Sequence, residues 1–335
     1  MAEVKSWVFT TAGYPHTLEW KDTKVPPKPS PNHVLVDVKS AALNPVDIQL
    51  MNFSLNSVPG LNGEKVVGKD FAGIVLGAAP DTGFERGDEV MGVTMAMDGS
   101  GTLTEAAHIN LGSSAVVKKP PHMSWNEAAS LPLVWLTAYT AIEKVAPYVD
   151  KSPGKKVAIL GGSSATGIYM LQLASRRAWT IMTTCSGRNL DFVKQQGAHQ
   201  VTDYTMAEDA VRRSVETFAP DAIIDCVGGT ECIGMAKKYV TIVGDKTSRA
   251  TMGGSFLYLT YPRMLLRWFL GAVGLGHSYD CIILETKAQW LEEAAKLDSR
   301  DIIIDSVFGF TKVKAAFEKL DTGRCRGKVV IDIQD

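Results

Sequence analysis

The chain has 335 residues, of which 45% are hydrophobic and 21% charged, and its formal net charge is −1. This length suffices for two domains that each bury a sizeable core, and the net charge gives no bulk reason to expect nucleic acid as a partner. The five cysteines form neither a close pair nor a metal-like spacing, which indicates reduced thiols in an intracellular protein. The N-terminus lacks both a signal-peptide core and an arginine-rich transit segment, so we expect a cytoplasmic location.

The N-terminal part of the chain is typical of a β-rich domain. The alternation His33-Val-Leu-Val-Asp-Val-Lys39 predicts a strand, and glycines then separate short strands as far as Gly101. The pattern changes near Met123. Ser124-Trp-Asn-Glu127 is a capping box, which predicts that a helix begins there.

From this helix to about residue 260, the pattern alternates between strands and helices. This alternation predicts a parallel sheet with crossover helices. The C-terminal tail then predicts strand 307–310, helix 313–320 and strand 328–333. The strands expected in the alternating region are 157–160, 180–184, 200–202, 222–226 and 239–243.

A glycine-rich turn follows the first strand of the alternating region. The sequence Val157-Ala-Ile-Leu-Gly-Gly-Ser-Ser-Ala-Thr-Gly167 passes from an apolar run into small residues, and helical spacing resumes at Ile168. A strand, a tight turn and a helix start form the geometry that seats a pyrophosphate on helical N–H groups. Ser164 stands where the dinucleotide fingerprint has its middle glycine.

The end of the next strand indicates which dinucleotide binds. Dinucleotide folds place a ribose-reading residue about 20 residues after the turn, and a carboxylate there hydrogen-bonds a free 2′-hydroxyl. This chain has Cys185-Ser-Gly-Arg188 at that point, with no carboxylate before Asp191. A hydroxyl and a guanidinium suit a 2′-phosphate, so Ser186 and Arg188 favour NADPH over NADH.

Residues 256–273 form a strongly apolar segment that contains Pro262, Arg263 and Arg267. The proline and the two arginines argue against a membrane span. A buried helix, a homodimer contact and an apolar lid that touches lipid remain alternatives.

Motifs along the whole chain resemble zinc-independent medium-chain dehydrogenases/reductases of the quinone oxidoreductase type. The segments nearest the C-terminus look closest to reticulon-4-interacting-protein-like quinone reductases, and Thr184-Cys-Ser186 is similar to fungal polyketide trans-enoyl reductases. The motifs that carry the resemblance are Ala41–Asp47, Gly68–Val75, Phe84–Gly92, Ala128–Pro132, Leu136–Tyr139, Gly197–Tyr204, Asp225–Gly229 and Gly327–Ile331.

The resemblance implies an α/β fold in which a Rossmann doubly wound parallel sheet is inserted into a GroES-like β-barrel domain. The expected boundaries are 1–125 for the GroES-like catalytic domain, 126–280 for the Rossmann domain and 281–335 for the return to the catalytic domain. The resemblance also places the active site between the two domains.

The resemblance further implies that the catalytic zinc of other relatives is absent. Those relatives hold zinc with Cys, His and Cys, whereas Asn44, Lys69 and Leu133 stand at the matching positions. We therefore expect no metal, and hydride transfer to an acceptor that is already polarised, such as a quinone or an α,β-unsaturated carbonyl.

Two residues are candidates for stabilising charge on the acceptor oxygen. Asn44 matches a family asparagine that faces the cleft, with a turn residue before Pro45 as the alternative. The Lys69 ammonium would polarise the carbonyl, with a salt bridge to Asp47 or Asp70 as the alternative.

The resemblance carries over a set of cofactor contacts for NADPH. Ser163, Ser164, Ala165 and Thr166, between Gly162 and Gly167, would line the pyrophosphate, and Ser186, Arg188 and Tyr204 would surround the 2′-phosphate. The remaining positions lie toward the nicotinamide or near the C-terminus: Thr137, Val227, Val243, Cys281, Ile282, Ile283, Arg324, Cys325 and Arg326.

The function expected from these features is NADPH-dependent reduction of a small lipophilic quinone or enone. A trans-enoyl reductase of a polyketide or other natural-product pathway, docked on a carrier protein, is one alternative. A non-catalytic NADPH-binding sensor or scaffold is the other, because the sequence identifies no indispensable acid or base.

Overall fold

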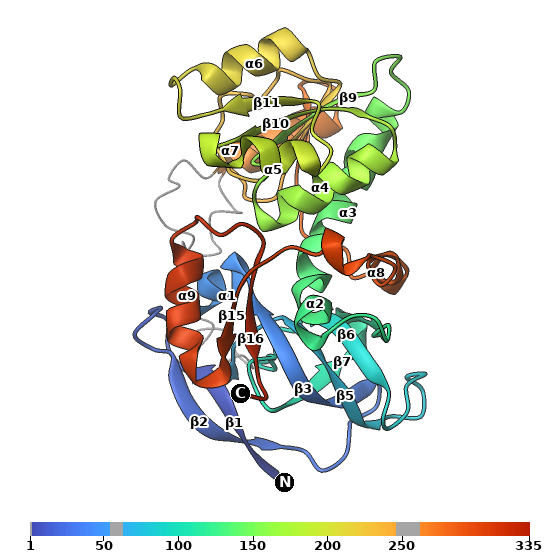
Figure 1. Ribbon diagram of the computed structural model, residues 1–335, viewed down its shortest axis with the longest axis vertical. Helices are drawn as coiled ribbons and strands as arrows, with labels where there is room; N and C mark the ends of the chain where they lie inside the picture. The colour runs from blue at the N-terminus through green and yellow to red at the C-terminus, as the bar shows by residue number, and fades with distance from the viewer. Residues whose placement is uncertain (1, 54–62, 246–261) are drawn as a thin grey trace. The chain divides into compact units, whose positions relative to one another are not determined.

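The computed structural model describes residues 2–53, 63–245 and 262–335 (Figure 1). The described chain divides into two compact units, one of residues 2–136 and 286–335 and one of residues 137–245 and 262–285. The sequence-based boundaries lie at 125/126 and 280/281. In the structure, the divisions fall inside helix α3 (Pro132–Val149) and after Glu285.

The first unit contains a seven-stranded sheet, and strands from both the N-terminal and the C-terminal part of the chain belong to it. Its strands run in the order β15-β16-β3-β5-β6-β8, and β7 also pairs with β3. The C-terminal strand β16 pairs antiparallel with β3, so that Val329 lies opposite Leu43. The strand bounds are β3 (His33–Leu43), β5 (Asp70–Ala78), β6 (Glu89–Thr94), β7 (Ala106–Asn110), β8 (Ser114–Lys118), β15 (Ile304–Gly309) and β16 (Lys328–Asp332).

A smaller sheet and four short helices complete the first unit. The three-stranded sheet has the order β2-β1-β4. The capping box predicted at Ser124 is confirmed, because the Ser124 N–H donates to Glu127 Oε2 at 2.8 Å and the Glu127 N–H donates to Ser124 Oγ at 3.3 Å. The bounds are β1 (Ala2–Phe9), β2 (Glu19–Val25), β4 (Lys65–Val66), α1 (Pro45–Met51), α2 (Trp125–Ser130), α8 (Ala288–Ala294) and α9 (Val313–Asp321).

Strand β3 lies at the centre of this unit and explains why its core forms where it does. Val34, Val36 and Val38 are at most 1% exposed, as their alternation predicts, and they belong to the main apolar cluster. Leu35, on the opposite face, is also buried, whereas Asp37 and Lys39 on that face are half-buried. The end of this buried strand leads directly to Asn44 and α1.

The second unit is a six-stranded, all-parallel sheet in the order β11-β10-β9-β12-β13-β14. The order reverses between β9 and β12, which makes the sheet doubly wound and confirms the predicted fold class. The bounds are β9 (Lys156–Leu160), β10 (Thr180–Cys185), β11 (Gln200–Asp203), β12 (Ala222–Asp225), β13 (Lys238–Thr241), β14 (Ser278–Cys281), α4 (Ala165–Arg176), α5 (Leu190–Gln195), α6 (Ala210–Phe218) and α7 (Pro262–Ala272).

The apolar segment 256–273 is described in part. Residues 256–261 lie outside the described residues, and α7 begins at Pro262, a position where a missing N–H removes no helical hydrogen bond. Met264 is buried on its inner side, and Arg267 donates to both oxygens of Asp245. Leu265, Leu266, Trp268, Phe269 and Val273 are each about half exposed. Of the helices that the structure describes, none is both long enough and apolar enough to cross a membrane.

Candidate functional site

The turn after β9 accepts only glycine at three positions. A Cβ on Gly161, whose φ is +88°, would lie 2.4 Å from Val227 Cγ1. A Cβ on Gly162 would lie 2.2 Å from Thr183 Oγ1, and one on Gly167 would lie 2.3 Å from Gly161 O. These contacts are far below van der Waals distance, so the backbone comes closer to its neighbours than any side chain permits. The turn therefore leaves bare backbone at the start of α4.

Ser164 has a structural explanation that the sequence alone did not provide. It is the N-cap of α4, and its Oγ accepts the Gly167 N–H at 3.0 Å. The cap uses one of the N–H groups that a helix start leaves without an intrahelical partner. The side chains from Ser163 to Thr166 are half-buried at this helix end. Binding of a pyrophosphate at this turn and helix start remains a prediction.

Residues predicted to read the adenosine end lie together at the carboxyl ends of β10 and β11. Cys185 and Asp203 are register partners, and the Tyr204 N–H donates to Cys185 O at 3.1 Å. Ser186 follows the same strand end, and Arg188 is exposed in the next turn. The parallel sheet therefore brings the two predicted phosphate contacts beside Tyr204.

Asp203 is a carboxylate at this edge that the sequence reasoning did not consider. Its Oδ1 accepts the Thr205 N–H at 2.9 Å and the Thr205 hydroxyl at 2.7 Å. These hydrogen bonds, together with one from the Gly187 backbone, lower the pKa of Asp203 below its usual value. Its charge opposes a bound phosphate, while its hydrogen bonds hold the two loops that carry Arg188 and Tyr204.

Other predicted cofactor residues of the second unit follow the remaining strands of the same sheet edge. The Val227 N–H donates to Asp225 Oδ1 at 2.9 Å, and the Val243 N–H donates to Thr241 Oγ1 at 3.2 Å. Cys281 ends β14, Ile282 is buried, and Ile283 is exposed. Thr137 lies in α3 and is 9% exposed.

Asp225 joins these loops and was missed by the sequence reasoning. It is fully buried at the end of β12 and accepts the N–H groups of Val227 and Gly228 at 2.9 Å each. The Thr241 hydroxyl donates to its other oxygen at 3.2 Å. Burial raises the pKa of this carboxyl. The signal in the sequence was an acidic residue at the end of an apolar strand, in Asp225-Cys-Val-Gly-Gly229.

Three further predicted cofactor residues belong to the first unit. Arg324, Cys325 and Arg326 lie in the turn between α9 and β16. The two arginines are exposed, and the Arg326 N–H donates to Asp305 Oδ1 at 2.7 Å. Their contact with a dinucleotide remains a prediction.

The first unit contains a buried polar cluster built from three distant segments. Asn44 Nδ2 donates to Asp70 Oδ2 at 2.9 Å and to Ala42 O at 3.3 Å. Lys328 Nζ donates to Asn44 Oδ1 and, at 2.9 Å, to Asp70 Oδ2. All three side chains are at most 2% exposed. Lys328 was not predicted as a site residue, although a lysine that opens the apolar run Lys328-Val-Val-Ile331 was a visible signal.

Lys69 lies next to this cluster and is 5% exposed. Its Nζ donates to Ala96 O at 2.7 Å, while Asp47 and Asp98 act on it through their charge. The expected alternative was a salt bridge to Asp47 or Asp70: the ion pair with Asp70 is formed by Lys328 instead, and Asp47 acts on Lys69 through its charge. Burial is the main influence on Lys69 and lowers the pKa of its ammonium.

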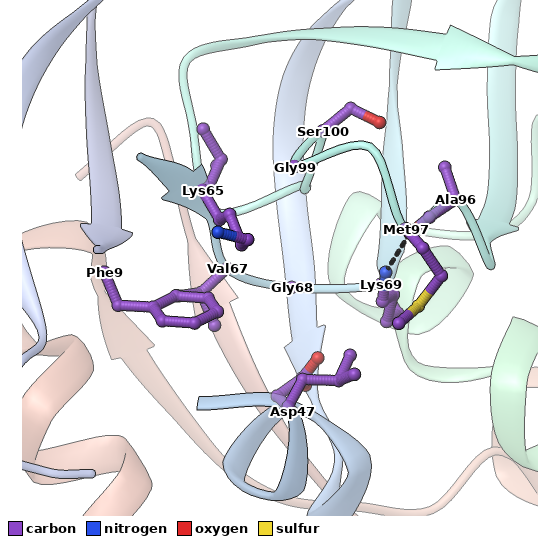
Figure 2. Close-up of a pocket in the computed structure, with 12 residues that line it drawn as sticks. Phe9, Asp47, Lys65, Val67, Gly68, Lys69, Ala96, Met97, Gly99 and Ser100 are labelled. Atoms are coloured by element: carbon purple, nitrogen blue, oxygen red, sulfur yellow. Dashed lines mark hydrogen bonds between the residues drawn. The ribbon is translucent and has the colours of Figure 1, made fainter. Parts of the chain in front are cut away.

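A small cavity borders Lys69 (Figure 2). It has a volume of about 30 Å³, and its lining includes Phe9, Asp47, Lys65, Lys69 and Met97. Asp47 belongs to the first turn of α1, where its Oδ2 accepts the Asn44 N–H at 2.8 Å. Burial raises the pKa of Asp47 to about 7. An acidic group and a basic group therefore line one cavity.

The positions expected to replace zinc ligands have other partners in the structure. The Leu133 N–H donates to Asp70 Oδ1 at 2.7 Å, and the Lys328 ammonium contacts both Asn44 and Asp70. Across residues 2–53, 63–245 and 262–335, no group of three His, Cys, Asp or Glu side chains is placed to hold a metal ion. Zinc independence stays a prediction.

Comparison with protein families gives two matches. The family described as "Alcohol dehydrogenase GroES-like domain" matches residues 30–121, and the one described as "Zinc-binding dehydrogenase" matches residues 196–331. The first match identifies the antiparallel part of the first unit as the GroES-like domain that was predicted.

Individual proteins are similar over nearly the whole chain. The bovine "NAD(P)H oxidoreductase RTN4IP1, mitochondrial" is 31% identical, and the match covers 98% of this chain and 89% of the relative. The tomato (Solanum lycopersicum) "2-methylene-furan-3-one reductase" is also 31% identical, with 98% and 79% covered. The solved structure of the quinone oxidoreductase from Coxiella burnetii has a TM-score of 0.80 and 27% identity, and the match covers 99% of this chain and all of that chain.

Proposed function

The chain belongs to the medium-chain dehydrogenase/reductase family, of the quinone oxidoreductase type, and we propose that it reduces a small quinone or α,β-unsaturated carbonyl with NADPH. Relatives named as quinone oxidoreductase and as 2-methylene-furan-3-one reductase support this acceptor class. The observation that carries the proposal is the glycine turn with the capped start of α4, which suits a dinucleotide. A bound nicotinamide supplies the hydride.

We propose NADPH rather than NADH because of the sheet edge at β10 and β11. Ser186 and Arg188 follow one strand end, and Tyr204 follows its neighbour. A guanidinium forms charge-assisted hydrogen bonds with phosphate oxygens that a free 2′-hydroxyl does not match. The Asp203 carboxylate at this edge would repel a phosphate. Its Oδ1 accepts two hydrogen bonds from Thr205, so this oxygen faces its own loop and not a ligand.

In this proposal, Asn44 and Lys69 stabilise the negative charge that develops on the acceptor oxygen. Asn44 Nδ2 donates to Asp70 Oδ2 at 2.9 Å, and its second hydrogen bond, to Ala42 O, is long at 3.3 Å, so the second N–H is the one that an acceptor oxygen would have to take over. Lys69 uses one N–H for Ala96 O and has two more to donate. Preorganised donors of this kind act most strongly where the local dielectric constant is low, as in a buried site.

The reaction is proposed to need no zinc. The acceptor is polarised by its own conjugation, and a lysine and an asparagine take the place of a Lewis acid. Elemental analysis of the purified protein should then find no stoichiometric zinc, and chelators should not inhibit it. One tightly held zinc per chain would contradict this mechanism.

NADPH oxidation with a panel of quinones and enones is the experiment that tests the proposed function. At least one acceptor should be reduced, and Asn44→Ala and Lys69→Ala should each lower turnover by ~10²–10³-fold. NADPH affinity should change much less, because neither side chain belongs to the nucleotide unit. Unchanged turnover in both variants would refute these two roles.

The same panel separates the alternatives. Preference for an enoyl group on a phosphopantetheine carrier would favour a trans-enoyl reductase. Tight NADPH binding without oxidation by any acceptor would favour a sensor or scaffold.

We propose that the exposed apolar side of α7 is an interaction surface and that it contacts a membrane. Leu265, Leu266, Phe269 and Val273 are exposed on its outer side. Residues 262–277 contain no acidic residue, and Arg263 is exposed, while Arg267 is paired with Asp245. Such a face suits the boundary of an anionic bilayer and a lipophilic acceptor. Vesicles of phosphatidylserine should bind the protein, and Leu266→Glu/Phe269→Glu should abolish binding. A monomer–dimer change caused by those substitutions, without vesicle binding, would identify a homodimer contact instead.

The proposed location is the cytoplasm. The bovine relative is named as mitochondrial, so fractionation of cells that produce the protein distinguishes the two compartments.

A further inference from the structure

Asp47 lines the cavity beside Lys69, and the proposed reaction gives it no role. It is 1% exposed, and only one of its carboxyl oxygens is hydrogen-bonded. Its Oδ1 is buried without a hydrogen-bond partner among the residues that the structure describes. Figure 2 shows the carboxyl pointing from α1 toward the Gly68–Lys69 segment. A buried carboxyl oxygen without a hydrogen-bond partner is costly, so a polar group placed against it would be stabilised.

The cavity is large enough for a water molecule. A water requires roughly 10–15 Å³ of such space and two or more polar partners. The cavity of about 30 Å³ meets the first condition, and the side chains of Asp47 and Lys69, which line it, provide polar partners for the second. The two side chains form no direct hydrogen bond in the described chain, so a bridging water would connect them.

The surroundings of Asp47 and Lys69 shift their pKa values in directions that favour proton transfer between them. Burial is the main cause that raises the pKa of Asp47 to about 7, and the charge of Asp70 raises it further. The Asn44 backbone and the charges of Lys69 and Lys328 act in the opposite direction. Lys65, also on the cavity lining, has a pKa lowered by burial, as has Lys69. An acid with a raised pKa beside an amine with a lowered one exchanges a proton at little cost.

We propose that Asp47 is the proton reservoir of the reduction and returns a proton to Lys69 through a water held in this cavity. The inference rests on the proposed function and extends it, because it supplies the proton that a hydride transfer leaves outstanding. Asp47 acts through Lys69 and does not touch the acceptor, so it is a positioning and proton-supplying residue.

The steps balance as follows. The acceptor gains one hydride, which carries two electrons and one proton, and becomes an enolate or a hydroquinone anion. An N–H bond of the Lys69 ammonium breaks as the acceptor O–H bond forms, which leaves a neutral amine. The Asp47 O–H proton then passes through the water to the amine, and the carboxylate that remains is reprotonated from solvent. One NADPH and one solvent proton are consumed for each acceptor reduced.

The chain provides a matched control in Asp98. Its charge also acts on Lys69, but it is exposed, and its Oδ1 accepts both the N–H and the hydroxyl of Ser100. Those hydrogen bonds, with the charge of Lys69, lower the pKa of Asp98, so it holds no proton to give at neutral pH. Asp98→Asn therefore removes a negative charge near Lys69 and no proton donor, whereas Asp47→Asn removes the proton donor.

The test compares the first turnover with steady-state turnover in rapid-mixing experiments on the full-length protein with NADPH and its best acceptor. In Asp47→Asn, the first turnover should stay within about twofold of wild type, because Lys69 begins protonated. Steady-state kcat should fall by ~10²-fold, because Lys69 then regains its proton slowly. Asp98→Asn should leave both rates near those of wild type. The asparagine retains an oxygen that accepts the Asn44 N–H, so α1 keeps its start.

Equal losses of both rates in Asp47→Asn, or no loss in either, would overturn the relay while the reductase function stands. If none of the acceptors in the panel is reduced by wild type and NADPH, the proposed function and the relay both fail. If Asp47→Asn does not fold, the solvent isotope effect on wild type tests the proposal. Deuterium oxide should slow the steady-state turnover of wild type more than its first turnover, and equal slowing of the two would refute the role of Asp47 as proton reservoir.

Discussion

The glycine turn of the second unit and the buried charged cluster of the first are specified by the sequence in different ways. The turn is local: Gly161, Gly162 and Gly167 lie within seven residues, and the close approach of backbone to neighbours dictates each of them. The cluster is assembled from the end of β3, the start of β5 and the start of β16. A local site can be recognised from one sequence motif. In a site assembled from distant segments, the charged residues are visible in the sequence, but their partners become known only from the fold.

The largest expected effect tests the assembled cluster. Lys328→Met leaves the Asp70 carboxylate, which is fully buried, without its ammonium, and we expect the free energy of unfolding to fall by about 3–5 kcal/mol. Chemical denaturation measures it. Lys118→Met is the matched control, because Lys118 pairs with Asp88 over the same 2.9 Å while its side chain is 66% exposed. An exposed pair contributes at most about 1 kcal/mol, so equal losses would show that burial does not set the effect.

The second prediction concerns the pH dependence of stability and comes from Asp47. Its ordinary pKa of 3.8 rises to about 7 in the folded chain, so the folded state keeps this proton to higher pH than the unfolded state does. Rising pH therefore favours unfolding between about pH 4 and pH 7. About three pKa units at roughly 1.4 kcal/mol each give a loss of up to about 4 kcal/mol. Denaturation across this range should show a larger loss in wild type than in Asp47→Asn, because Asp225, whose pKa is also raised, is present in both.

The third prediction tests the local turn. Gly162→Ala places a methyl group 2.2 Å from Thr183 Oγ1, which is itself fixed by donating to Ile159 O at 2.6 Å. We expect a loss of about 1–3 kcal/mol in stability and weaker dinucleotide binding. Gly154→Ala is the control, since its nearest neighbour would be Lys156 Cγ at 3.5 Å. Calorimetry of NADPH binding measures the difference, and a normal affinity in Gly162→Ala would show that the turn does not hold the phosphates.

These contrasts indicate how much of the protein was predictable. Strands β9 and β12 fall within one residue of their predicted limits, because parallel strands with both faces buried read as apolar runs. Strand β14 was not predicted, because Ser278-Tyr-Asp-Cys281 is a polar edge strand. The pairing of Lys328 with Asp70 was equally invisible, because 258 residues separate them in sequence. Ser164 was predicted as a pyrophosphate contact and a departure from the fingerprint, but not as the N-cap that a serine before a helix indicates.

The last and smallest prediction addresses the adenosine end of the local site. Arg188 is exposed in the turn after β10, beside Ser186 and across from Tyr204. We expect NADPH to bind at least ~10-fold more tightly than NADH, which is about 1.4 kcal/mol. Arg188→Ala should remove most of this preference and leave NADH binding nearly unchanged, because a guanidinium contributes chiefly where a phosphate is present. Lys194→Ala is the control, because it removes one positive charge from the end of α5 rather than from the sheet edge. Equal weakening of both nucleotides by Arg188→Ala would show that this arginine supports the loop and does not read the phosphate.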